Sequence, residues 1–197
     1  FSIKNWVTSQ PLFHTLAATG KIMNVNFDAS CALVMPEACL PGLTGGDAFA
    51  FLVAHNLGEV SGCVNNADVL CNMTDNPASS RAALIGYSNI GANIRDCVNY
   101  GDVTLNMVNH AAGTGYFGTV SARFVSSAET IGFGIYNCKN YGDFTINISN
   151  SNSANSYVGA VTGSSNSYTV TEGCENYGNL TYNSGNSAAA VVMAGVT

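Results

Sequence analysis

The chain has 197 residues, of which 47% are hydrophobic and only 9% charged, against roughly 25% charged residues in ordinary soluble domains. Its length suits one large domain or one array of repeats, and no apolar run reaches the about 18–20 residues of a membrane helix. A net charge of −6 with only six lysine and arginine residues argues against nucleic-acid binding, which needs clustered cations.

Residues 1–19 are predicted to be an entry segment or a partial coil, in which only Leu12–Leu16 could form a short helix or turn. From Gly20 the sequence GKIMNVNFDASCALV is a degenerate copy of a later unit, with Val25 in the place of a cysteine. The chain opens on Phe1, and both ends fall in mid-pattern. We therefore expect a processed product or a piece of a longer polypeptide.

A motif built around a cysteine returns four times in the rest of the chain. It reads CVNNADVL at Cys63, CVNYGDVT at Cys97, CKNYGDFT at Cys138 and CENYGNLT at Cys174. The motif is kept while the spacing varies, which indicates a structural repeat with loops of adjustable length.

Within one repeat, polar and apolar residues alternate as they do in β-strands. After the turn at Tyr100-Gly101, the stretch Val103–Met107 alternates strictly, and a further short strand is expected around Tyr116 to Val120. This gives about three short strands per repeat.

Equivalent residues that recur in every repeat are typical of a parallel β-helix, where each coil lies about 4.8 Å above the previous one. We predict an all-β fold, a right-handed parallel β-helix (β-solenoid) whose repeats occupy residues 20–197. About five coils are expected, beginning near Ile22, Val60, Ile94, Ile135 and Val170.

Stacking turns each repeated residue into a column. The cysteines are expected to be buried free thiols, the asparagines to bond to the copies above and below at the bend, and the tyrosines to cover the corner. An aromatic platform for sugars or a partner is the alternative for the tyrosines. The predicted structural ladders are Cys63, Cys97, Cys138 and Cys174; Asn65, Asn99, Asn140 and Asn176; and Tyr100, Tyr141 and Tyr177.

Three cysteines, Cys31, Cys39 and Cys71, lie outside this column and are expected to form a disulfide, although the sequence does not say which two pair. A further column, Asp68, Asp102 and Asp143, ends in Asn179. Its carboxylates suggest either calcium binding or ordinary turn chemistry, and the Asp after Gly favours the turn.

The outward face after this column has the pattern Thr-x-Asn in three repeats, beginning at Thr104, Thr145 and Thr181. Such a face suits any uncharged solenoid surface and also an ice-binding one. Three triplets fit the acceptor pattern for N-linked glycans. The possible glycosylation sites are Asn72, Asn147 and Asn179.

No catalytic constellation, metal site or cofactor is predicted. The histidines His14, His55 and His110 occupy different positions of the repeat, so they do not suggest a metal triad. The pair Arg95-Asp96 fits a surface ion pair, and Lys139 and Glu175 are expected to pair across adjacent coils.

Units of the form I-x-N-C-x-N-Y-G-D-V-T, each followed by a Gly/Ala-rich short strand, resemble the repeats of large secreted surface proteins. Some of those proteins carry the Gly-rich GLUG motif. The opening PLFHTLAATGKIMNVNFD is similar to the start of such arrays, so the resemblance covers the chain from about Pro11 onward. The chain departs from it at the three extra cysteines and at Ala67, where a glycine is usual.

The resemblance implies a β-helix with a secreted or cell-surface location and an adhesive or scaffolding role. We therefore expect a non-enzymatic structural segment of an extracellular protein or filament. Its open coil ends would meet neighbouring repeats or further copies, because exposed strand edges need a partner. A glycan-binding or polysaccharide-cleaving β-helix is the main alternative, and an ice-binding solenoid is a further one.

Overall fold

A computed structural model describes residues 1–35, 47–74, 79–89, 91–108, 114–127, 132–149, 155–185 and 191–196. These residues contain β-strands and no helix, and the strands form five sheets. The first sheet comprises β1 (Ser2–Ile3), β5 (Asn26–Phe27), β10 (Val64–Asn65), β15 (Val98–Asn99), β20 (Lys139–Asn140) and β25 (Glu175–Asn176). The second sheet comprises β2 (Val7–Thr8), β6 (Ala32–Met35), β11 (Val69–Thr74), β16 (Val103–Val108), β21 (Phe144–Ser149) and β26 (Leu180–Gly185).

The other three sheets have five strands each. The third sheet comprises β7 (Asp47–Phe49), β12 (Ser79–Arg81), β17 (Thr114–Gly118), β22 (Asn155–Gly159) and β27 (Val191–Ala194). The fourth sheet comprises β3 (Phe13–Leu16), β8 (Val53–Asn56), β13 (Ile85–Ser88), β18 (Ser121–Phe124) and β23 (Thr162–Ser165). The fifth sheet comprises β4 (Lys21–Met23), β9 (Glu59–Ser61), β14 (Asn93–Arg95), β19 (Gly134–Tyr136) and β24 (Val170–Glu172).

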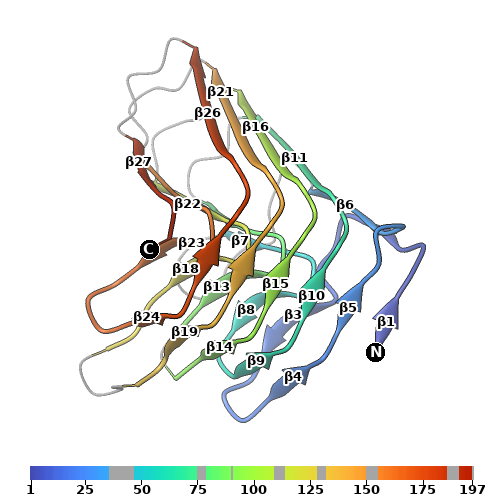
Figure 1. The fold of residues 1–197 in the computed structure, drawn as a ribbon, viewed down its shortest axis with the longest axis vertical. Helices are drawn as coiled ribbons and strands as arrows, with labels where there is room; N and C mark the ends of the chain where they lie inside the picture. The colour runs from blue at the N-terminus through green and yellow to red at the C-terminus, as the bar shows by residue number, and fades with distance from the viewer. Residues whose placement is uncertain are drawn as a thin grey trace.

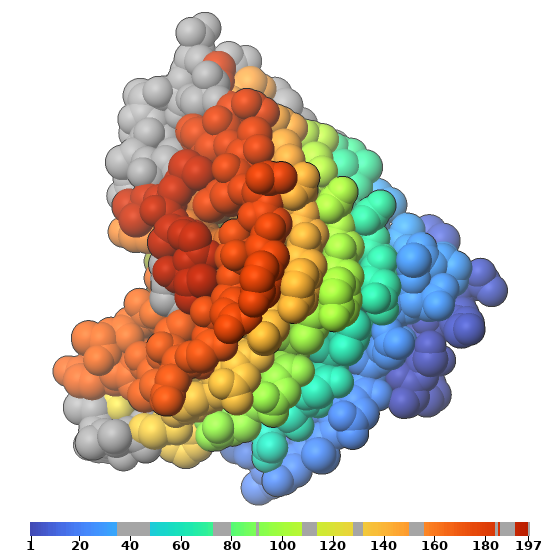
Figure 2. All heavy atoms as spheres, in the orientation of Figure 1, coloured from blue at the N-terminus to red at the C-terminus, as the bar shows by residue number. Residues whose placement is uncertain are grey.

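Strand pairing within these sheets is parallel, and neighbouring strands come from successive passages of the chain, as in β5, β10 and β15. The ribbon therefore winds repeatedly through the same path (Figure 1). The residues form parallel bands whose colour passes in order from blue to red (Figure 2). This all-β arrangement of parallel strands in stacked sheets is compatible with the predicted β-solenoid.

The register of the strands matches the sequence alignment at the motif positions, whereas the expected start of the last coil at Val170 is one residue early, because Ile135 pairs with Thr171. Asn99 pairs with Asn65 on one side and with Asn140 on the other, and Thr145 pairs with Thr104 and Thr181 in the second sheet. Each repeated residue therefore lies directly above its equivalent in the previous repeat.

The expectation of about three strands per repeat is wrong, because most repeats contribute a strand to each of five sheets. The strand expected to run into the Cys-x-Asn motif breaks just before the cysteine, at a residue with left-handed backbone. This residue is Gly62 (φ 61), Asp96 (φ 55), Asn137 (φ 54) or Gly173 (φ 64). The Gly-rich stretch also divides into two strands that meet at a corner, as in β17 and β18.

The N-terminal segment also departs from the expectation of a short helix or turn at Leu12–Leu16. Phe13–Leu16 is strand β3 and pairs in parallel with β8, while β1 and β2 pair with β5 and β6. The next passage of the chain offers a strand edge, and pairing with it satisfies the backbone groups that a helix would satisfy internally.

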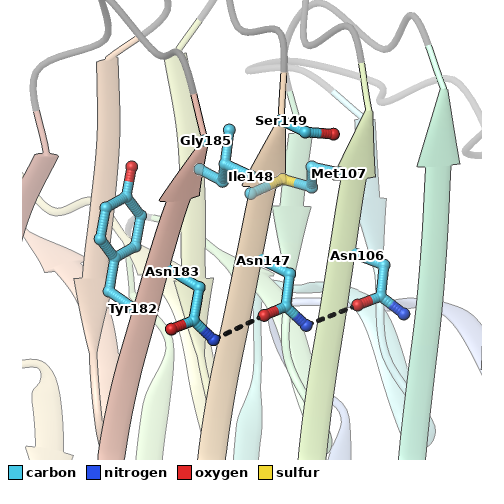
Figure 3. Close-up of a pocket in the computed structure, with 8 residues that line it drawn as sticks. All are labelled: Asn106, Met107, Asn147, Ile148, Ser149, Tyr182, Asn183 and Gly185. Carbon is cyan, nitrogen blue, oxygen red and sulfur yellow. Dashed lines mark hydrogen bonds between the residues drawn. The ribbon is translucent and has the colours of Figure 1, made fainter.

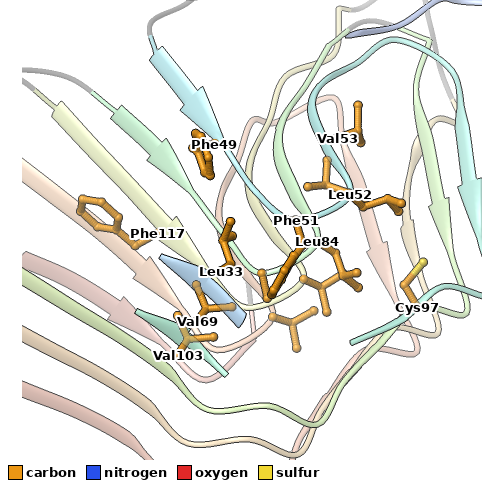
Figure 4. Packing of buried hydrophobic residues seen from close by; sticks show 14 of the residues in the cluster. Leu33, Phe49, Phe51, Leu52, Val53, Val69, Leu84, Cys97, Val103 and Phe117 are labelled. Atoms are coloured by element: carbon orange, nitrogen blue, oxygen red, sulfur yellow. The ribbon is translucent and has the colours of Figure 1, made fainter. Parts of the chain in front are cut away.

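The core is a continuous column of buried apolar side chains between the sheets. Leu33, Val69 and Val103 stack in the second sheet and face Phe49 and Phe117 of the third (Figure 4). Burial of these apolar side chains is the main source of folding stability in a chain with so few charged residues.

Candidate functional site

The asparagine column forms a continuous amide ladder at the bend. The side-chain Nδ2 of Asn65 donates to Oδ1 of Asn99 (2.8 Å), Asn99 to Asn140 (2.8 Å), and Asn140 to Asn176 (2.8 Å). Each Nδ2 also donates to the carbonyl oxygen two residues on, for example from Asn99 to Gly101 (2.7 Å). Asn65, Asn99 and Asn140 are 0% exposed, so these bonds satisfy amides that have no contact with water.

The tyrosine column lies beside the asparagines on the outer surface. The rings of Tyr100 and Tyr141 stack at 4.9 Å, and those of Tyr141 and Tyr177 at 4.7 Å. The side chains are 50%, 40% and 60% exposed in chain order. The ring of Tyr141 lies between the other two, so it exposes its edge and not its faces. This favours corner packing over a sugar platform.

The aspartate column is also used within the protein. Oδ1 of Asp68 accepts a hydrogen bond from the backbone N–H of Asp102 (2.9 Å), and Oδ1 of Asp102 accepts one from Asp143 (2.8 Å). Asp143 in turn accepts from both the backbone and the side-chain nitrogen of Asn179. Each carboxylate thus holds the next repeat in register, which fits the turn interpretation of this column better than the calcium one.

The outward face of the second sheet carries a second amide ladder (Figure 3). Nδ2 of Asn183 donates to Oδ1 of Asn147 (2.8 Å), Asn147 to Asn106 (2.7 Å), and Asn106 to Asn72 (2.9 Å). This ladder runs in the opposite sense to the one at the bend. Because the threonines lie in register beside it, the face keeps the regularity on which the ice-binding hypothesis depends.

The predicted glycosylation sites lie on or near this face and remain predictions. Asn72 and Asn179 are exposed, whereas Asn147 is half-buried. The side-chain nitrogens of Asn147 and Asn179 already donate hydrogen bonds. A glycan would replace one N–H of each amide, so attachment at these two positions would compete with the ladder contacts more than at Asn72.

The cysteine column is inward, as predicted, and its thiols are free. Cys63, Cys97 and Cys138 are fully buried, while Cys174, in the last repeat, is only partly buried. A hydrogen bond with the Cys138 thiol lowers the pKa of Cys174 to about 7, against the opposing effect of burial. The same interaction and burial raise the pKa of Cys138.

We expect iodoacetamide to alkylate Cys174 at least several-fold faster than the three buried cysteines of the same column, because an accessible thiolate is the reacting species. The rate should increase as the pH is raised through about 7. Mass spectrometry of peptides from protein labelled at about pH 6 and about pH 8 measures this. In urea-unfolded protein all four should react alike, and equal rates in the folded protein would contradict the prediction.

The expected disulfide among the three extra cysteines is wrong, because every possible pair includes Cys31 or Cys71 and both are free. Cys31 and Cys71 are buried free thiols, and Cys39 lies outside the described residues. The Cys31 thiol donates to the carbonyl oxygen of Ile3 (3.3 Å), while burial raises the pKa of Cys71 to about 11 against the effect of nearby Arg81. Both cysteines therefore behave as small core residues.

The expected pair between Lys139 and Glu175 is present, with Nζ 2.8 Å from Oε2. The side chain of Arg95 instead stacks on the ring of Tyr136, 4.1 Å from its centroid, and Asp96 accepts a hydrogen bond from Asn137. The structure therefore does not join Arg95 and Asp96 as an ion pair.

A cluster that the sequence interpretation missed lies where the third and fourth sheets meet. The guanidinium of Arg123 lies 4.4 Å from the ring centroid of Tyr116 and 5.5 Å from that of Tyr87, and Tyr116 stacks on Tyr157 at 5.4 Å. The His55 ring meets Tyr87 edge-on. The equivalence of Tyr116 and Tyr157 in adjacent repeats was the available signal.

The histidines do not converge on a metal site in the part of the chain that is described. The rings of His14 and His55 are 5.5 Å apart, and His110 lies outside the described residues. Among the described residues, no three His, Cys, Asp or Glu side chains form a group that could hold a metal ion. No helix long and apolar enough to span a membrane occurs in those residues.

The last repeat is less covered than the repeat before it. Cys174, Asn176 and Leu180 are partly exposed, whereas their equivalents in the preceding repeat, Cys138, Asn140 and Phe144, are 0% exposed. Strands β23 to β27 form one edge of all five sheets, and their residues form the orange-to-red end of the stack (Figure 2).

Thiols, amides and carboxylates at the motif positions thus bind mainly to one another and to the backbone, and the last repeat leaves an open edge. Comparison with protein-family models, with curated proteins and with solved structures finds no match to this chain.

Proposed function

We propose that this chain is a non-enzymatic structural or adhesive segment of an extracellular surface protein or filament, built as a right-handed β-helix of about five coils. The observation that carries the proposal is the use of the repeated polar residues. The amides of the bend asparagines hydrogen-bond to one another from repeat to repeat. The carboxylates of Asp68 and Asp102 accept hydrogen bonds from the backbone of the next repeat. These are the contacts of a scaffold, in which regularity along the axis is the useful property.

The open edge at the last repeat supports the second part of the proposal, that the segment binds neighbouring repeats or further copies of itself. A parallel sheet edge presents unpaired N–H and C=O groups and readily pairs with another strand. The extracellular location rests on the resemblance of the repeats to those of secreted surface proteins, and the three glycosylation triplets are compatible with it.

The proposal predicts that the purified chain releases no new reducing ends or unsaturated products from a panel of acidic and neutral polysaccharides. Absorbance assays for reducing ends and for unsaturated products, followed over a day of incubation, measure this. A polysaccharide lyase and a glycosidase are the positive controls. Product release that survives repurification of the protein would contradict the proposal and support the polysaccharide-cleaving alternative.

A glycan-binding role is a second candidate, and the cluster of Arg123, Tyr116 and Tyr157 favours it. The guanidinium can donate to the carboxylate of an acidic sugar, and the partly exposed ring of Tyr157 at the end of the stack can pack against the sugar's apolar face. If this role holds, Arg123→Gln should weaken retention on an acidic polysaccharide by roughly tenfold. Tyr177→Ala, at the distant corner ladder, is the matched control, and equal losses from both variants would remove this candidate.

A further inference from the structure

The polar ladders have a direction, and this direction defines what the open edge can bind. In the bend ladder each amide donates toward the higher-numbered repeat, from Asn65 through to Asn176. Asn176 therefore continues the series as a donor: one N–H of its Nδ2 bonds to Gly178, and the other is left to point along the axis. An incoming strand must place an acceptor over Asn176.

The two outer columns have the opposite requirement. Each carboxylate of the aspartate column accepts from the next backbone N–H, so Asn179, which follows Asp143, continues that column with its Oδ1. In the ladder on the second sheet each amide donates toward the lower-numbered repeat, so Asn183 offers its Oδ1 as an acceptor. An incoming strand must therefore bring a backbone N–H and a side-chain amide N–H at these two places.

The apolar and aromatic columns continue in the same way. The Tyr177 ring stacks on Tyr141 with one face and is 60% exposed, and Cys174 and Leu180 are only partly covered. A strand that completes this edge must present a small apolar residue, an aromatic ring and a larger apolar residue at the matching positions.

The repeat itself meets all these requirements. The motif beginning at Cys138 has an amide at Asn140, a ring at Tyr141, a backbone N–H at Asp143 and a second amide at Asn147. Because asparagine carries both a donor and an acceptor, the same residue fits the donor Asn176 at the bend and the acceptor Asn183 on the outer face.

The opposite end of this chain does not meet the requirements. The residue equivalent to Asn65 is Phe27 and then Ile3, and Phe27 stacks on Trp6 and Phe51. A second copy that docked by this end would place Ile3 over Asn176, which leaves the amide without an acceptor. The two ends are thus chemically unlike, and head-to-tail stacking of identical copies of this segment is disfavoured.

We propose that the edge formed by β24, β25 and β26 binds, by strand addition, a separate segment that carries the same Cys-x-Asn-Tyr-Gly-Asp-x-Thr-x-Asn repeat. The main-chain bonds of the added strand give affinity, and the ladder residues select the sequence. This inference rests on the proposed scaffold function, whose partners it narrows to one class: polypeptides with this repeat.

The test uses the full 197-residue protein and a fluorescent peptide with the sequence of residues 135–149, IYNCKNYGDFTINIS, under reducing conditions. Fluorescence anisotropy measures binding up to about 1 mM peptide. We expect saturable binding that weakens at least tenfold when the peptide carries Asn140→Leu and Asn147→Leu. The protein variant Asn176→Leu should weaken binding of the unaltered peptide, whereas Asn72→Leu, at the far end of the outer ladder, should not.

Absence of binding overturns the inference, and so does equal binding of the two peptides, which would show only a sticky apolar edge. Sedimentation that reveals self-association blocked by the peptide would assign the edge to a second copy instead. The polysaccharide assay is independent of these results: peptide binding together with product release would keep the inference and overturn the scaffold function.

Discussion

Replacement of Asn99 by leucine is expected to lower the free energy of unfolding by about 3–6 kcal/mol. Leucine has a similar volume but removes the acceptor of Asn65 and the donor to Asn140 and to the Gly101 carbonyl. Each polar group left buried without a partner costs about 1–3 kcal/mol. Urea denaturation followed by circular dichroism and by Trp6 fluorescence measures the change.

The matched control for this substitution is Asn106→Leu, in the same repeat. Asn106 also belongs to an amide ladder, but its bonds to Asn72 and Asn147 lie on the outer face, where water can replace them. Its expected cost is below about 1 kcal/mol. If Asn99→Leu does not fold, Asn176→Leu at the half-buried end should give a smaller, measurable loss. Equal costs at Asn99 and Asn106 would show that burial of the ladder does not matter.

Replacement of Gly101 by alanine is expected to destabilise the protein by at least about 3 kcal/mol, at or above the upper end of ordinary overpacking. A Cβ at Gly101 would overlap the carbonyl oxygen of Ala67 and lie 2.5 Å from its carbonyl carbon. Since these atoms belong to the backbone of the adjacent repeat, no side-chain rotation relieves the overlap, and the strands must separate.

Gly185→Ala is the control, because the nearest atom to its added Cβ is the Ile148 oxygen at 3.9 Å. Alanine there should change stability by less than about 0.5 kcal/mol or increase it slightly through reduced chain entropy. Thermal unfolding of the two variants beside the unaltered protein distinguishes these outcomes. A Gly101→Ala protein as stable as the Gly185→Ala protein would mean that neighbouring repeats are less tightly packed than described.

A longer connection in the preceding passage explains why alanine is tolerated at Ala67, the position that glycine occupies in later repeats. Asn65 and Val69 pair with Phe27 and Leu33 of the preceding passage. Three residues, 66–68, connect the first pair of positions, whereas five residues, 28–32, make the equivalent connection in the preceding passage. The longer connection leaves room for a methyl group, and Ala67 is buried in the apolar cluster. Loop length in one repeat thus decides which residue the next repeat can accept.

The sequence by itself determined the all-β class, the alignment of the motif positions and which residues stack into columns. It did so because period-two alternation and a motif kept at variable spacing leave few arrangements other than parallel stacking. The free inward thiols, the bend asparagines and the stacked tyrosines were all predictable from equivalence of position. The cross-strand pair of Lys139 and Glu175 was predictable for the same reason.

Only the tertiary structure decided how the chain bends and how each column bonds. The extra corners arise at single left-handed residues such as Asp96 and Asn137, which a strand pattern does not reveal because the apolar alternation continues on both sides. Phe13–Leu16 became a strand because a neighbouring edge was available. The opposite senses of the two amide ladders depend on side-chain rotamers in the stacked state. The motif does not reveal this directionality, on which the proposed specificity of the open edge rests.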